Sequence, residues 1–158
     1  MTSLILSLFV SLSFVSEHQL KKDIVWQTQK ELPNITIKSY YALSSGRIRI
    51  IQNEMKSIKR RFNDYYMTNC KPGPLEIRIV KISWLNSSDY FDWVDHRYLV
   101  FGRYFKLRNI MYVTSETFSD LYTLDHELTH YMYDECIVYF ESDAQEHRQL
   151  DRFLKSTN

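Results

Sequence analysis

The stretch TLDHELTHYM, Thr123–Met132, decides how the fold and the function of this chain are interpreted. It holds two of the chain's five histidines, His126 and His130, and Glu127 follows the first of them. Large apolar residues recur around it at steps of three and four, which is the period of a helix: Phe118, Leu121, Leu124, Leu128 and Met132. We therefore expect one helix over residues 115–135.

Two histidines four residues apart lie on the same face of a helix, so His126 and His130 are placed to bind one metal ion. Glu127 lies one step round the helix, where its carboxylate can take a proton from a metal-bound water. Imidazole suits this task because it offers a neutral nitrogen ligand at pH 7. The motif predicts a zinc site. The alternative is a polar helix face that carries two histidines by coincidence.

The stretch resembles the extended His-Glu-x-x-His signature of the zincin metallopeptidases. In that family Val or Thr usually stands three residues before the first His, and uncharged residues fill and follow the motif; Thr123 and Leu128 fit this pattern. The resemblance covers residues 108–150 and implies a peptidase with Zn²⁺ as cofactor and a peptide or protein as substrate. It also implies that Glu127 is the general base and then the acid, and that residues 108–115 form the edge strand beside the substrate.

A catalytic zinc takes three protein ligands and keeps one position open for water. The stretch ESDAQ resembles the thermolysin-like gluzincin pattern, which implies Glu141 as the third ligand. Gln145 stands where the family has the residue that accepts the N–H of a zinc-bound imidazole. Glu146 and His147 remain alternative third ligands. On a helix they point away from Glu141, so only one of the three can face the metal.

The other elements follow from apolar periodicity and turn residues. We expect a helix over 44–67, strands over 75–84, 97–105 and 108–114, and a last helix over 140–154. Ser115 is the expected N-cap of the motif helix, and Gly102 the expected turn between the last two strands. The order predicts an α+β fold: a small zincin-like domain with a short mixed or antiparallel sheet packed on the motif helix, and an antiparallel second helix after it.

Length and charge limit the classes of protein that the chain can represent. Its 158 residues fit one domain, and 20 Lys and Arg against 19 Asp and Glu leave it nearly neutral. A near-neutral chain gives no electrostatic reason to expect nucleic acid or an anionic membrane as a partner. The oligomeric state does not follow from the sequence.

The first sixteen residues are typical of a signal peptide, because Leu4–Val15 carries no charge and is too short to span a bilayer. We expect residues 1–16 to be removed and residues 17–158 to form one secreted or periplasmic domain without a membrane span. Cys70 and Cys136 would then form a disulfide or remain two buried thiols. The alternatives are a cytoplasmic regulatory zinc protease, or a zincin-fold binding module without catalysis.

Overall fold

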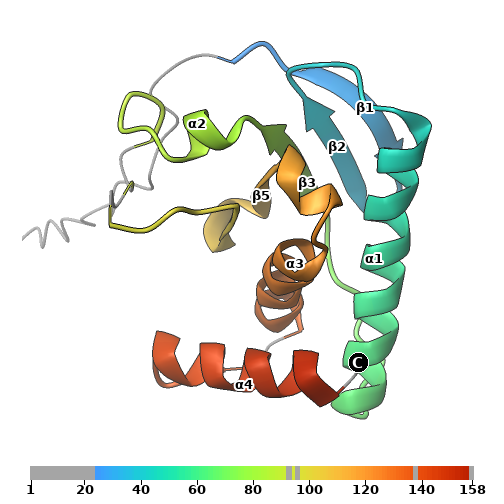
Figure 1. Cartoon of the computed structure of the whole chain (residues 1–158). Coiled ribbons are helices and arrows are strands. Elements are labelled where there is room, and N and C mark those ends of the chain that lie inside the picture. Colours follow the sequence, from blue (N-terminus) through green and yellow to red (C-terminus); the bar gives the residue numbers. More distant parts are fainter. Residues whose placement is uncertain (1–23, 92–93, 95–96, 137–138, 157–158) are drawn as a thin grey trace, which may run out of the picture.

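The computed structural model describes residues 24–91, 94, 97–136 and 139–156. The expected signal peptide, residues 1–16, lies outside the described residues. Figure 1 shows an α+β arrangement, with a mixed sheet on one side of the molecule and three long helices packed beneath and beside it. The expected fold class is therefore confirmed. Within the described part of the chain, no helix combines the length and the apolar character that a membrane crossing requires.

Five strands form the sheet, in the order β1-β2-β3-β5-β4. They are β1 (Gln27–Leu32), β2 (Ile35–Ser39), β3 (Leu75–Val80), β4 (Gly102–Phe105) and β5 (Ile110–Thr114). The central pairs β2–β3 and β3–β5 are parallel, whereas β1 and β4 run antiparallel to their neighbours at the two edges. The strands β1 and β4 are thus the two edges of the sheet.

The helices are α1 (Ser45–Tyr65), the short α2 (Ile82–Leu85), α3 (Tyr122–Glu135) and α4 (Asp143–Ser156). Ser44 caps α1 as its hydroxyl accepts the N–H of Arg47. The helix α1 buries the apolar stripe that its period predicts: Ile51, Met55, Ile58 and Phe62. The helix α3 carries the His-Glu-x-x-His motif, and α4 lies across it (Figure 1) rather than returning antiparallel beside it.

One main core joins the helices to one face of the sheet. Its buried residues come from β2, β3 and β5 on the sheet side and from all three long helices on the other, including Ile77, Leu128 and Phe153, which are fully buried. A second, smaller core around Leu85 and Phe91 covers the opposite face. The motif helix is therefore held on its apolar side by the main core, and its histidine face points the other way.

Several boundaries differ from the sequence expectation for local reasons. The strand over 75–84 ends at Val80 because the chain turns into α2. The helix expected from Ser115 is interrupted: η2 (Ser115–Phe118) is a short 3₁₀ turn, and α3 begins at Tyr122, where the Asp120 carboxylate accepts the Tyr122 N–H. Ser115 is therefore not the N-cap of the motif helix.

The hairpin at the edge of the sheet also differs from the expectation. Its turn is η1 (Lys106–Arg108) followed by Asn109, which adopts the left-handed conformation with φ 49°, and it does not lie near Gly102. Residues 110–114 form β5, which pairs on both sides, so they are not the edge strand. The edge strand on this side of the sheet is β4. The strands β1 and β2 were not expected at all.

A disulfide joins Cys70 to Cys136, with their Cα atoms 5.7 Å apart. It connects the loop after α1 to the C-cap of α3. Two further contacts hold the same end of α3 to this loop: the Glu135 carboxylate accepts the Gly73 N–H at 2.7 Å, and the Tyr131 hydroxyl donates to the Gly73 carbonyl. A disulfide fits an extracellular protein, because such cross-links persist in oxidising compartments.

Candidate metal centre

The helix α3 places His126 and His130 side by side, as their spacing predicts. Their Nε2 atoms lie 3.2 Å apart. Two nitrogen ligands at about 2.0–2.1 Å from one tetrahedral zinc would stand about 3.3 Å apart. The two Nε2 atoms are hydrogen-bonded at this distance, and the same separation suits two ligands of one metal ion.

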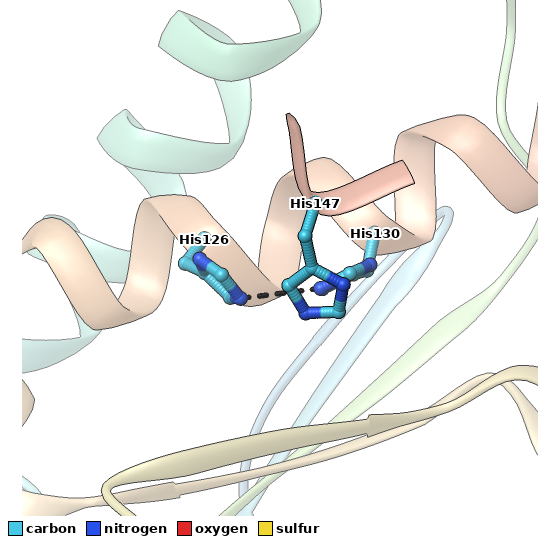
Figure 2. Close-up of side chains that lie close together, drawn as sticks. All are labelled: His126, His130 and His147. Atoms are coloured by element: carbon cyan, nitrogen blue, oxygen red, sulfur yellow. Dashed lines mark hydrogen bonds between the residues drawn. The ribbon is translucent and has the colours of Figure 1, made fainter. Parts of the chain in front are cut away.

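A third histidine joins the pair from a different helix. His147 of α4 brings its ring centroid to 5.6 Å from that of His126 and 4.8 Å from that of His130. One ligand nitrogen from each of the three lies within 4.8 Å of the other two. Figure 2 shows the three rings gathered on one side of α3, with His147 reaching in from α4. We call these three residues the histidine cluster.

Hydrogen bonds at Nδ1 prepare two of these rings to bind a metal through Nε2. The Nδ1 of His130 lies 2.5 Å from a carboxylate oxygen of Glu146, and the Nδ1 of His147 lies 2.9 Å from the carbonyl of Asp143. A neutral imidazole that donates from Nδ1 keeps the lone pair on Nε2. Both acceptors therefore favour the tautomer with a metal-binding Nε2.

Burial favours the neutral forms of His126 and His130. Loss of hydration on burial, together with the nearby His130 and His147, lowers the pKa of His126 to about 4. The pKa of His130 is also lowered, because burial outweighs the opposing effect of Glu146. The Nδ1 of His126 is buried and has no hydrogen-bond partner within the described residues. Neutral imidazoles are the form that binds a metal, so the lowered pKa values of His126 and His130 favour metal binding at neutral pH.

Glu127 lies beside the cluster but does not belong to it. Its side chain is 8% exposed, and its Oε2 accepts the backbone N–H of Tyr104 in β4 at 2.8 Å. Burial raises the pKa of Glu127 to about 7, against the opposing effects of the Tyr104 N–H and of Arg103. A carboxyl group with such a pKa can both take and return a proton near neutral pH.

The residues expected from the gluzincin pattern occupy other places. Glu141 is exposed and precedes α4, and the structure does not bring it to the histidine cluster. Its backbone N–H donates to the side-chain oxygen of Gln145 at 2.7 Å. Gln145 in turn donates its own N–H to the Ser142 hydroxyl. These contacts link Glu141 to the first turn of α4. Glu146, rather than Gln145, contacts the imidazole of His130.

A cleft of about 360 Å³ exposes the cluster to solvent. The strand β4 lines one wall through Gly102 and Arg103, and the histidine cluster and Glu127 line the other. Lys106 and Asp134, which also line the cleft, form an ion pair of 2.9 Å. The cleft therefore lies between an edge strand and the two helices that hold the candidate ligands.

Gly102 is a residue whose role the sequence did not reveal. A Cβ atom at this position would lie 2.8 Å from the Cγ of Glu127 and 2.8 Å from a methyl carbon of Thr123. Separations below 3.0 Å require a neighbour to move. The strand can approach α3 this closely only because Gly102 has no side chain. The sequence hints at this packing role only in that the chain has just three glycines.

No family model, no curated protein and no solved structure matches this chain. The class of protein is therefore defined by the site alone: an α+β domain with three histidines that could hold a metal ion, two of them on one helix.

Proposed function

We propose that this protein is a small zinc-dependent peptidase of the zincin type, with His126, His130 and His147 as ligands. The observation that carries the proposal is the 3.2 Å separation of the two Nε2 atoms on α3, with a third imidazole beside them. Three imidazoles and an open cleft are the arrangement of a catalytic zinc site, in which the fourth position is left for water. His147 replaces Glu141 in this assignment.

The donor set supports zinc. Neutral nitrogen ligands suit zinc, copper, iron and nickel, whereas magnesium and calcium prefer oxygen. Three His ligands in a closely spaced group are an established zinc arrangement, and zinc imposes no geometry of its own on the protein. Glu146 adds support, because histidines that bind zinc commonly donate their other N–H to a carboxylate.

Glu127 supports hydrolysis rather than metal storage. A bound zinc supplies the chemistry of lowering the pKa of water to about 7 and polarising a carbonyl. Beside it, Glu127 would take a proton from the attacking water and return it to the leaving amine. Its burial holds the pKa of the Glu127 carboxyl group near neutrality. A site that only stored a metal would have no use for this residue.

The edge strand supports an extended peptide as the substrate. Among the described strands, β4 pairs with β5 alone. The main-chain groups on its other side could therefore bond to a second strand, except for the Tyr104 N–H, which Glu127 accepts. The cleft runs along this side and contains the histidine cluster. An extended peptide in it would place one of its bonds near the metal. The disulfide supports a secreted or periplasmic location.

A comparison of the wild-type protein with Glu127→Gln tests the function. Both proteins should bind one zinc, because no ligand is lost. Hydrolysis of a mixed peptide library by Glu127→Gln should fall by about 10²–10⁴-fold, the usual contribution of a positioned acid–base group. A chelator should abolish the wild-type activity and zinc should restore it. Equal cleavage by both proteins would remove Glu127 as the base, and no cleavage by either would favour a binding module.

A further inference from the structure

The register of β4 shows which of its backbone groups face the cleft. The carbonyl of Phe101 accepts the N–H of Thr114 at 2.9 Å, and Gly102 lies opposite Val113. In an antiparallel pair, hydrogen-bonded positions alternate with positions whose groups point away from the neighbour. Gly102 and Tyr104 are therefore the residues of β4 whose N–H and C=O groups turn away from β5.

The outward N–H of Tyr104 is occupied by the carboxylate of Glu127. At the other outward residue, Gly102, the close contact with the Cγ of Glu127 leaves no room for a side chain. Two alternate residues of one strand thus fix the same side chain from two directions. Tyr104 holds its carboxylate end, and Gly102 limits where its methylene groups can lie.

We propose that β4 positions the general base, and that the backbone N–H of Tyr104 and the absence of a side chain at Gly102 are the two positioning elements. This inference rests on the proposed function, since it gives Glu127 the role of base. A hydrogen bond from a backbone N–H to a charged carboxylate is one of the stronger kinds in proteins. Here it sets the position of the carboxylate relative to the cleft.

One consequence concerns the substrate. Because Glu127 takes the Tyr104 N–H, a peptide beside β4 is left with the N–H and C=O of Gly102 and the C=O of Tyr104. The base and the substrate are then held by the same short strand. A small shift of β4 would move both together, whereas loss of one contact would move the base alone.

The test compares Tyr104→Pro with Tyr104→Ala, both loaded with zinc. Each variant loses the phenol, which bonds Asn109 and Asp134, but only proline also removes the N–H. Proline is tolerated on an edge strand where the N–H does not pair with the neighbour. We expect kcat for an extended peptide to be about 10- to 100-fold lower in Tyr104→Pro than in Tyr104→Ala. KM and zinc content should differ little.

A second pair covers the case in which Tyr104→Pro does not fold. Gly102→Ala should lower kcat with zinc retained, because its Cβ displaces Glu127. Gly46→Ala is the matched control, since a Cβ there meets only the Ser44 hydroxyl at 3.8 Å, and it should keep the wild-type kcat. In the NMR spectrum of the zinc-loaded protein, Glu127→Gln should shift the Tyr104 amide resonance more than the other amides of β4.

The outcomes separate this inference from the proposed function. Zinc-dependent cleavage by the wild type, with equal kcat in the two Tyr104 variants and an unchanged Tyr104 amide in Glu127→Gln, would overturn the positioning role and leave the function standing. A wild-type kcat in Gly102→Ala would show that Gly102 does not position Glu127. A wild type without zinc-dependent cleavage would overturn the function, and the positioning of a base would fall with it.

Discussion

A carboxylate oxygen of Glu146 lies 2.5 Å from the Nδ1 of His130, and the next residue along α4 is His147 of the histidine cluster. Consecutive residues of one helix thus perform two tasks at the site: one orients an imidazole of α3, and the other adds an imidazole of its own. Docking of α4 against α3 therefore both completes the cluster and brings the Glu146 carboxylate to the Nδ1 of His130.

The third ligand is the first point to test. His147→Ala should lower zinc affinity by about 100-fold or more, because it removes one of three nitrogen ligands. Glu141→Ala should leave the affinity nearly unchanged, since Glu141 is exposed and lies outside the cluster. Competition with a chromogenic chelator would measure both. An unchanged affinity in His147→Ala, with a loss in Glu141→Ala, would restore the gluzincin ligand set.

The contact between Glu146 and His130 predicts a smaller effect. Glu146→Gln keeps an oxygen that can accept the Nδ1–H of His130 but removes its charge, so zinc affinity should fall by about 10-fold, and in Glu146→Ala by up to about 100-fold. Glu141→Gln is the control, because it makes the same charge change on an exposed side chain. Equal affinities in all of these proteins would show that the contact does not orient the ligand.

Docking of α4 should couple zinc binding to the core. Phe153 is fully buried, and its ring lies 6.0 Å from that of Phe62 on α1. Phe153→Ala should lower the free energy of unfolding by about 3–5 kcal/mol and also weaken zinc binding by the folded protein. Leu85→Ala, which changes a fully buried residue of the second core on the opposite face of the sheet, should lower stability without weakening zinc binding. Urea unfolding and calorimetric zinc titration would separate the two effects.

The disulfide should act on stability more than on the metal site. It spans 66 positions of the chain, and closing a loop of that length is expected to contribute about 4 kcal/mol. The double variant with Cys70→Ser and Cys136→Ser should lose about this much in urea unfolding. The folded fraction should still bind zinc, because the contact between Glu135 and Gly73 holds the same end of α3. An unchanged unfolding midpoint would contradict the prediction.

The sequence predicted those parts of the site that depend on local spacing. His126 and His130 are four residues apart on one helix, so their proximity needs no knowledge of the rest of the chain. The α+β class and the long amphipathic α1 followed in the same way from periodicity. These features are decided within about 20 residues of chain, where side-chain period and caps dominate.

The rest depends on contacts between distant segments. His147 could not be preferred over Glu141 because that choice depends on where α4 begins and on how it crosses α3. The strand β1 has the polar sequence QTQKEL and carries no alternating pattern, so pairing with β2 rather than its own composition makes it a strand. The requirement for glycine at position 102 comes from the close approach of β4 to α3, which no local sequence pattern reveals.

The position of the three histidines along the chain has a consequence for the order of folding. They all lie between residues 126 and 147, so the loop that must close to bring them together is short and costs little entropy. The contact between Tyr104 and Glu127 is about as local, because it spans 23 residues and β4 pairs with β5 in an antiparallel hairpin. We expect the metal site and the positioned Glu127 to form in the same phase of refolding. Stopped-flow mixing with a zinc indicator and a fluorogenic peptide would time zinc capture and the proposed cleavage, and a long delay between the two would contradict this expectation.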